Sequence, residues 1–194
     1  MQHRIFIRNA RKGEGKTIAE LILLAWPVDE FLAADPSMTY EILRNMIAVV
    51  VESEQTIYSY ENTVVAVIMD ESTGTEKIIG ALCGYDGADY IKLKQPILEI
   101  IGYDSDFART VETEAGEFYL DSVGVDPEYR GMGIATMLFG ALISKAAALG
   151  HKKVGLSVDI DKPLAERLYR RLGFEHTGFR SFFGHQMKHM TRNI

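Results

Sequence analysis

The chain has 194 residues, of which 47% are hydrophobic and 25% charged, a composition typical of one globular domain with a sizeable core. Its formal net charge of -6 excludes sequence-independent binding of nucleic acid, which needs clustered Lys and Arg side chains to neutralise phosphates. The longest apolar runs, at 21–26 and 46–51, are far shorter than the roughly 20 residues that cross a bilayer, so no membrane span is expected.

The first predicted element is a short strand, RIFIRN, followed by the stretch RKGEGKT at Arg11–Thr17, which ends like many nucleotide-binding loops. A P-loop needs Gly, four residues and then Gly-Lys-Ser/Thr, so that backbone N–H groups surround the phosphates. Counting back from Gly15, the place of the first Gly holds Ala10. The strand is also charged at both ends, whereas a P-loop follows a buried apolar strand. We therefore expect a solvated turn before a helix.

Two helices and a hairpin are predicted next. Apolar residues recur at helical spacing over about 16–26, and again over about 38–53. The period then changes, and the β-branched runs 62–70 and 77–87 predict two strands joined as a hairpin. Residues 88–115 are mixed in character, so we expect an insertion with some helix that walls a substrate pocket.

The second half alternates strands and helices. The pattern predicts strands at 117–126 and 151–159, and a long helix between them that ends at Gly150. A further helix begins with Pro163 in its first turn and ends before Gly173. Two strands flanking Gly184 close the chain. This order predicts one mixed-sheet α/β domain over 1–194, without an internal repeat or linker.

The cysteine and histidine content argues for a reducing compartment and against a metal. The lone cysteine, Cys83, cannot form an internal disulfide, and the N-terminus lacks the apolar segment of a signal peptide, so we expect a cytoplasmic protein. No His is placed to activate Cys83, which predicts a packed thiol. His185 and His189 are four residues apart, but their segment is predicted to be a strand and no third ligand is evident, so no metal is expected.

The turn between the strand at 117–126 and the long helix has the features of an anion site. The first N–H groups of a helix have no intrahelical partner, and the helix dipole adds partial positive charge there. Glycines at 131 and 133 let a pyrophosphate approach that backbone, and Arg130 can add a charged contact. The alternative is that the two glycines serve only close packing, because a short Gly-x-Gly is a weak signal.

Two blocks of sequence together resemble the GNAT superfamily of N-acyltransferases. RGMGIA, preceded by LDSVGVDPEY, is similar to the family pattern Arg/Gln-x-x-Gly-x-Gly/Ala at the acetyl-CoA site. KPLAERLYRRLGF, at 162–174, is similar to the later block Asn-x-x-Ala-x-x-Leu-Tyr-x-x-x-Gly-Phe, with Lys162 in the place of the Asn. The blocks cover about 118–174, and the hairpin fits the first half of the family less specifically. The resemblance implies a mostly antiparallel twisted sheet flanked by helices.

The resemblance also implies where acetyl-CoA binds. Backbone N–H groups of the turn would hold the pyrophosphate, and the main chain of the preceding strand would pair with the pantetheine arm. The change from Asn to Lys162 leaves one expected polar contact to that arm open, and Lys162 either meets a phosphate or faces solvent. The residues implied to bind the cofactor are Val123, Val125, Arg130, Gly131, Met132, Gly133, Ile134, Ala135 and Lys162.

The resemblance assigns the catalytic acid, while the base stays open. Tyr169 would protonate the leaving thiolate of coenzyme A, since a phenol of pKa near 10 is protonated at neutral pH; the alternative is that it only edges the core. Asp121 and Glu117 have the same parity in one strand, so both carboxylates project from one face. Either could take the proton of the amine, or both could be solvated charges. The oxyanion would meet a backbone N–H such as that of Val123.

These observations predict transfer of an acetyl group from acetyl-CoA to a primary amine of a small molecule or peptide. Two alternatives stay open: a longer acyl-CoA as donor, and a coenzyme A-binding sensor without turnover, which retention of Tyr169 argues against. Acidic residues either attract a cationic acceptor or form a solvated loop; they are Asp104, Asp106, Glu112, Glu114, Glu117 and Asp121. A homodimer is compatible with the family, but the sequence does not decide it.

Overall fold

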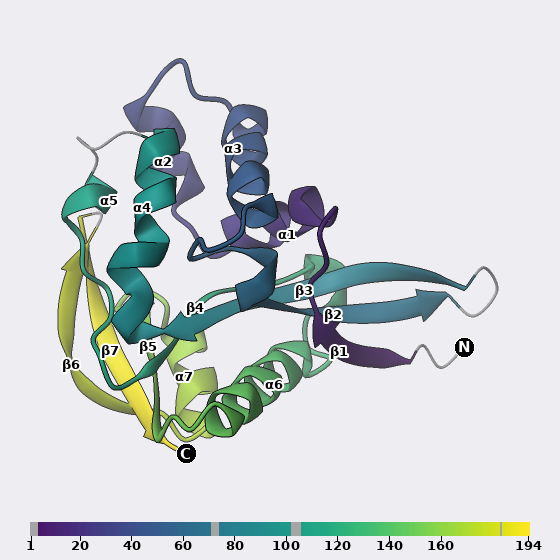
Figure 1. The fold of residues 1–194 in the computed structure, drawn as a ribbon, viewed down its shortest axis with the longest axis vertical. Helices are drawn as coiled ribbons and strands as arrows, with labels where there is room; N and C mark the ends of the chain where they lie inside the picture. The colour runs from purple at the N-terminus through teal and green to yellow at the C-terminus, as the bar shows by residue number, and fades with distance from the viewer. Residues whose placement is uncertain (1–3, 71–73, 102–105, 183) are drawn as a thin grey trace. The chain divides into compact units, whose positions relative to one another are not determined.

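The computed structural model describes residues 4–70, 74–101, 106–182 and 184–194, and it confirms the mixed α/β fold (Figure 1). Within these residues the strand order is β1-β2-β3-β4-β5-β7-β6. The strands are β1 (Ile5–Asn9), β2 (Thr63–Asp70), β3 (Thr75–Asp86), β4 (Phe118–Val125), β5 (Lys153–Asp159), β6 (Glu175–Phe182) and β7 (His185–Asn193). The α-helices are α1 (Gly15–Leu23), α2 (Val28–Ala34), α3 (Tyr40–Glu52), α4 (Tyr90–Ile101), α5 (Asp106–Arg109), α6 (Ile134–Ala148) and α7 (Pro163–Arg171). None of these helices is long and apolar enough to span a membrane.

Residue contacts divide the chain into two compact units. The first consists of Met1–Cys83 and Ser122–Leu142, and the second of Gly84–Asp121 and Ile143–Ile194. Three elements, β3, β4 and α6, contribute residues to both units. The single domain that we expect over the whole chain stays a prediction.

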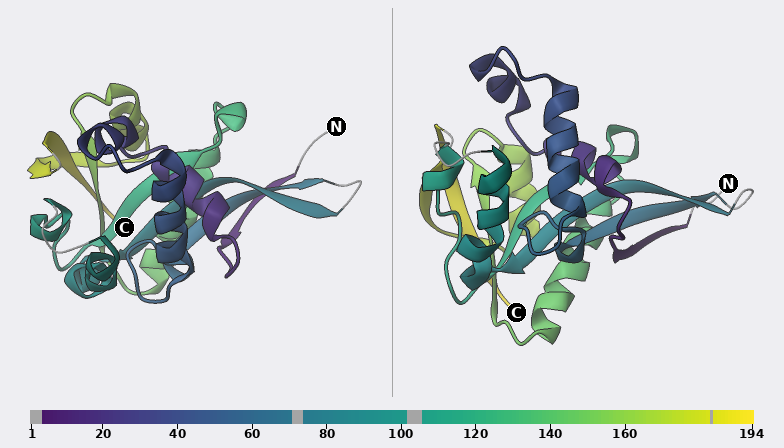
Figure 2. Two further views of the ribbon diagram at one scale, coloured as in Figure 1. Left: turned by 90° about the horizontal axis from the view of Figure 1, so that it is seen from above. Right: turned by 45° about the horizontal axis from the view of Figure 1, so that its top comes forward.

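In the first unit, β1, β2 and β3 form an antiparallel meander, with Ile5 opposite Ile68 and Val64 opposite Leu82. The predicted hairpin is therefore confirmed. In Figures 1 and 2, α1 and α3 lie side by side on one face of these strands, and the beginning of α6 lies on the other. Glycines make the packing close: a Cβ at Gly80 would come within 3.0 Å of Ile134, and one at Gly124 would collide with the backbone of Leu21.

The helices of the first unit follow the apolar pattern of the sequence, with one exception. Ile18 and Ile22 of α1 are fully buried, and so is Val50 in the stripe of α3, whose first residue Tyr40 is exposed. Thr39 caps α3 by accepting the Ile42 N–H at 3.2 Å. The sequence pattern missed α2, which begins directly after Pro27. Val28, Phe31 and Leu32 have helical spacing, but the seven residues of α2 make only about two turns, too few for the period to stand out.

In the second unit, β4 and β5 are parallel, and their pairing joins Phe118 to Val154 and Tyr119 to Gly155. β7 pairs antiparallel with both β5 and β6. The insertion expected at 88–115 contains helix, as predicted, and α4 continues through Pro96. Figures 1 and 2 show α4 and α7 on opposite sides of the strands of this unit. Gly173 has the positive φ of +85° that the predicted end of α7 requires.

Candidate active site

The turn from β4 to α6, in the first unit, is built by local hydrogen bonds. The Asp126 carboxylate accepts the Glu128 N–H at 3.0 Å, and the Asp126 N–H donates to the Ile79 carbonyl at 2.9 Å. Arg130 Nε donates to the Val125 carbonyl at 3.2 Å. On the far side of the turn, Lys77 Nζ lies 3.4 Å from the Asp126 carboxylate. These contacts fix the backbone that leads into α6.

Gly131 and Gly133 stand open at the start of α6. Their φ values are +81° and +78°, in the left-handed region that favours glycine. A Cβ at either position would meet no atom of the described residues within 4 Å. Close packing within the chain is therefore not the reason for these glycines. The two side chains next to these glycines differ in exposure: Met132 is 53% exposed, whereas Ile134 is buried. Ile134 can therefore offer a ligand only its backbone.

The other candidate anion turn, RKGEGKT, already holds an anion of the chain itself. The N–H of Gly13 donates to both carboxylate oxygens of Glu52, at 3.0 and 2.8 Å, and that of Gly15 donates to Glu52 Oε1 at 2.6 Å. A Cβ at Gly15 would lie 2.8 Å from the Ala48 carbonyl oxygen. The expected turn before a helix is confirmed, and Arg11, Lys12 and Gly13 are exposed. The sequence did not reveal that Glu52, the last residue of α3, binds the N–H groups of this turn.

Tyr169 lies on α7 in the second unit, and Lys162 directly precedes this helix. The Tyr169 ring is 8% exposed and packs edge-to-face on Phe174, with centroids 6.3 Å apart. Burial raises the pKa of Tyr169 to about 12, so the phenol keeps its proton at neutral pH. Lys162 is exposed at the N-cap position of α7, where its carbonyl accepts the N–H groups of Ala165 and Glu166.

Asp121 is the half-buried carboxylate on β4. Tyr85 Oη donates to Asp121 Oδ2 at 2.9 Å. Tyr85 is 2% exposed, and its ring is tilted against Tyr119 with centroids 5.9 Å apart. Because Tyr85 is fixed by packing, one oxygen of Asp121 has a fixed direction.

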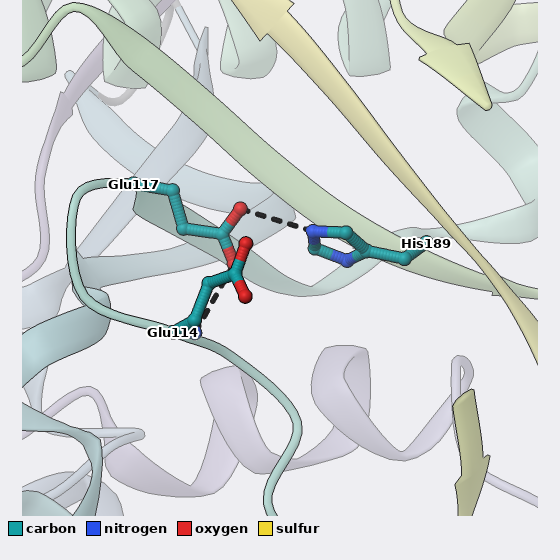
Figure 3. Close-up of side chains that lie close together, drawn as sticks. All are labelled: Glu114, Glu117 and His189. Atoms are coloured by element: carbon teal, nitrogen blue, oxygen red, sulfur yellow. Dashed lines mark hydrogen bonds and ion pairs between the residues drawn. The ribbon is translucent and has the colours of Figure 1, made fainter. Parts of the chain in front are cut away.

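Glu117, directly before β4, lies in a different environment (Figure 3). Its buried carboxylate is 3.0 Å from His189 Nε2 and accepts Thr113 Oγ1–H at 2.9 Å and the Glu114 N–H at 3.4 Å. Burial raises the pKa of Glu117, but hydrogen bonds to His189, Thr113 and the Glu114 amide outweigh it, and the net shift is downward. Tyr119 stacks on His189 at 6.5 Å and also contacts Tyr85. Glu117 is therefore a strongly bonded anion and a poor proton acceptor.

The same residues form the one group within the described ranges with metal-ligand spacing. Ligand atoms of Glu114, Glu117 and His189 lie within 4.8 Å of one another. The sequence did not reveal this group, because His189 is 72 residues from Glu117 in the chain. Glu114 also lies 3.6 Å from Lys153 Nζ and 3.7 Å from an Arg180 nitrogen. Two cations beside one of three ligands oppose a metal ion electrostatically. The contacts favour an ion-pair network.

Sequence reasoning missed a buried polar cluster around α4. Tyr90, Lys94 and Glu112 are 1%, 2% and 7% exposed. Lys94 Nζ donates to the carbonyls of Ala108 and Thr110, at 3.1 and 2.5 Å. The sequence could have indicated that Lys94 is buried, because it lies within the apolar stripe of α4. Glu112 carried none, since it lies in an irregular segment before β4.

Comparisons with known proteins agree with this architecture. A sequence profile described as the acetyltransferase (GNAT) family matches residues 23–174. The protein ML0378 of Mycobacterium leprae (strain TN) is 36% identical over 81 residues, which are 42% of this chain and 21% of that protein. The chain therefore spans about a fifth of the length of this curated relative.

Solved structures of similar fold cover nearly the whole chain. An N-acetyltransferase from Staphylococcus aureus Mu50 superposes with a TM-score of 0.81 at 24% identity, over 96% of this chain and all (100%) of that one. Another crystal structure, of an acetyltransferase, gives a TM-score of 0.71 at 29% identity, over 97% and 98% of the two chains. Since the profile covers well over half of the sequence, the chain belongs to the acetyltransferase (GNAT) family, whose members transfer an acyl group from acyl-CoA to an amine.

Proposed function

We propose that the protein transfers an acetyl group from acetyl-CoA to a primary amine of a small molecule or peptide. The observation that carries this proposal is the open turn at the start of α6, where two glycines adopt positive φ and no atom of the described residues occupies the space beside them. A pyrophosphate needs such space to reach the unpaired N–H groups of a helix. The contrast with the α1 turn, which a carboxylate fills, supports the assignment.

The proposed cofactor contacts follow the first turn of α6. The N–H groups of Gly131, Gly133 and Ala135 hold the pyrophosphate, and the exposed Met132 flanks it. The first helical hydrogen bond runs from the Met137 N–H to the Gly133 carbonyl, so the N–H groups before Met137 are available for a ligand. Further contacts come from the main chain of Val123 and Val125 to pantetheine, the guanidinium of Arg130, the backbone of Ile134 and the ammonium of Lys162.

The proposed chemistry uses one base and one acid. Asp121 takes a proton from the acceptor ammonium, and the free amine attacks the thioester carbonyl to form a tetrahedral oxyanion, which the Val123 N–H stabilises. Collapse breaks the C–S bond, and Tyr169 gives its proton to the departing thiolate. The nitrogen loses its second proton to solvent as the amide forms, and solvent returns a proton to the Tyr169 phenolate and removes the one held by Asp121. We assign the base to Asp121 rather than Glu117, because the Glu117 carboxylate is already bonded to Thr113, Glu114 and His189.

Replacing Tyr169 tests the acid. In Tyr169→Phe we expect kcat to fall by about a hundredfold, because the thiolate leaves without a proton donor. Acetyl-CoA affinity should change less than about threefold, since the ring and its packing on Phe174 are kept. The rate of thiol release at saturating substrate measures kcat, and calorimetric titration measures the affinity for acetyl-CoA. Undiminished turnover would remove Tyr169 from the mechanism.

Calorimetric titration with acetyl-CoA, with ATP in parallel, tests the function as a whole. Saturable binding of acetyl-CoA followed by amine-dependent thiol release supports it. Binding without release for any amine indicates a coenzyme A sensor, and faster release from a longer acyl-CoA indicates a different donor. Binding of ATP alone contradicts the proposal. A cytoplasmic location and a homodimer stay predictions.

A further inference from the structure

Charged side chains of the second unit connect elements that are neighbours in space. In the acidic run between 104 and 121, Asp104 and the side chain of Asp106 lie outside the described residues, and Glu117 is bonded to His189. Another group of charged side chains joins β7 to α7, the helix that carries the proposed acid. The contacts of this group show how α7 is held.

The helix α7 buries little of its own surface. Of its nine residues, all of which the structure describes, only Tyr169 is buried. The N–H groups of Gly173 and Phe174 donate to the carbonyls of Arg170 and Tyr169, both at 3.0 Å, which is the Schellman ending of a helix. In this motif the Phe174 ring packs on Tyr169 and fixes the phenol relative to the end of α7. One buried side chain does not fix the orientation of the whole helix, so other contacts are needed.

Alternate residues of β7 supply contacts to both ends of α7. Residues 188, 190 and 192 share one face of the strand, and Met190 in the middle is fully buried. Lys188 Nζ donates to Oε2 of Glu166, in the first turn of α7, at 2.7 Å. Arg192 Nη1 donates to the carbonyl of Leu172, directly after the helix, at 2.8 Å. One strand therefore binds the helix at its beginning and at its end.

Glu166 is oriented for this contact by its own helix. Arg170, one turn further along α7, donates from Nε and Nη2 to Glu166 Oε1 at 3.0 and 2.8 Å, while Oε2 accepts Lys188. A carboxylate in the first turn and a guanidinium at the carbonyl end both complement the helix dipole. The Glu166 and Lys188 side chains keep 14% and 26% of their exposure, so the pair contributes little to global stability. Its effect is mainly on the position of α7.

The opposite face of β7 binds a different element of the site. His189 lies between the residues that contact α7, and its ring is bonded to Glu117, directly before β4 (Figure 3). The strand β4 carries Asp121, the proposed base. The two faces of β7 thus contact the helix of the acid and the segment that leads into the strand of the base.

We propose that Lys188 and Arg192 are positioning residues of acyl transfer, which hold both ends of α7 on β7 so that the Tyr169 hydroxyl reaches the departing thiolate. This inference rests on the proposed function. Neither cation contacts the reacting atoms in this scheme, and both act through Tyr169. A proton donor must lie within about 3 Å of the atom that it protonates, and a displacement of about 1 Å costs up to about a hundredfold in rate.

Amide hydrogen exchange of the protein without substrate tests the attachment of α7 independently of activity. In Lys188→Met, peptides covering 163–174 should exchange at least about threefold faster than in the wild type, and Arg192→Met should have the same effect. Lys188→Arg keeps the charge and should match the wild type. Arg167→Met removes an exposed cation of α7 itself and is the matched control. Unchanged exchange in both Lys188→Met and Arg192→Met would overturn the inference.

Turnover then tests whether the two cations act through Tyr169. Lys188→Met should lower kcat about tenfold and Lys188→Arg should restore it, while the Kd of acetyl-CoA stays within about threefold, because its pyrophosphate is assigned to the α6 turn. In a Tyr169→Phe background, Lys188→Met should lower kcat by about twofold or less, since the acid is already absent. Equal losses in the two backgrounds would overturn the positioning role. Faster exchange of α7 without turnover in any of these proteins, the wild type included, contradicts the proposed function instead.

Discussion

Two helices of the first unit begin with a glycine-rich turn, and the two turns differ in what occupies them. At the start of α1, the N–H groups of Gly13 and Gly15 are bonded to the Glu52 carboxylate. At the start of α6, Gly131 and Gly133 face space that no described residue fills within 4 Å of a Cβ. In both turns the first N–H groups of the helix lack an intrahelical acceptor and lie at the positive end of a helix dipole. One has an internal anion, and the other is open to an external one.

The difference shows that a glycine turn before a helix predicts an anion but not its source. The carboxylate of Glu52 stabilises the fold by joining α3 to α1, and it excludes a phosphate from Gly13 and Gly15 by occupying their N–H groups. The α6 turn is held by side chains at its rim, such as Asp126, which leave the N–H groups of the helix start to a ligand. The difference between the two turns therefore depends on tertiary contacts and not on their glycines.

Blocking the open turn should have the largest effect. In Gly133→Val, the added side chain would lie where the pyrophosphate is expected, so acetyl-CoA binding should weaken at least a hundredfold, or by about 2.7 kcal/mol. Calorimetric titration of the folded variant gives this ratio. Gly13→Val is the matched control: Gly13 has a φ of +96° and no atom within 4 Å of a Cβ, so the backbone strain is similar while the binding site is untouched. Equal affinity in the two variants would contradict the assignment of the open turn.

The sequence predicted the elements that depend on local periodicity. The hairpin of β2 and β3, the helices α1 and α3 and the β4-turn-α6 segment all follow apolar spacing or glycine position, and the structure confirms them. The helix α2 was missed, because its seven residues make only about two turns and show the apolar period too briefly.

The candidate site was predictable only where its residues are close in sequence. Gly131 and Gly133 lie within one motif, and the block that ends in Gly173 identifies Tyr169. Glu52 is 37 residues from Gly15, and Tyr85 is 36 residues from Asp121. These pairs depend on how helices and strands pack, which one sequence does not reveal. Glu112 was named only among a run of acids, without a reason to separate it from Glu114.

Removing the Glu52 carboxylate from the α1 turn should have an intermediate effect. Glu52→Ala leaves the N–H groups of Gly13 and Gly15 without their carboxylate, so we expect the free energy of unfolding to fall by about 2 kcal/mol in urea titration. Inorganic phosphate should restore part of the loss, since the turn would then resemble that of α6. Glu41→Ala at the exposed start of α3 is the control and should change stability by about 0.5 kcal/mol or less. Unchanged stability in Glu52→Ala would show that water replaces the carboxylate without loss.

The smallest expected effect concerns Glu14, whose carboxylate also bonds to the α1 turn. Its carboxylate lies 2.6 Å from an Arg8 nitrogen and accepts the Arg11 N–H at 2.7 Å. Burial raises the pKa of Glu14, but the bonds from Arg8 and Arg11 outweigh it, so the folded value lies below the ordinary 4.5. The stability from these bonds is therefore complete above pH 4.5 and is lost as the pH falls through the lower folded value.

Glu14→Gln should accordingly reduce the free energy of unfolding by about 1 kcal/mol at pH 7, and the difference from the wild type should shrink as the pH approaches 3. Urea titrations at several pH values measure this convergence, with Glu20→Gln on the exposed side of α1 as the control. The size is modest because the Arg8 and Glu14 side chains keep 13% and 18% of their solvent exposure. A difference in the free energy of unfolding that stays unchanged down to pH 3 would show that the shape of Glu14, rather than its charge, stabilises the α1 turn. The turn would then depend on a carboxylate charge only at Glu52.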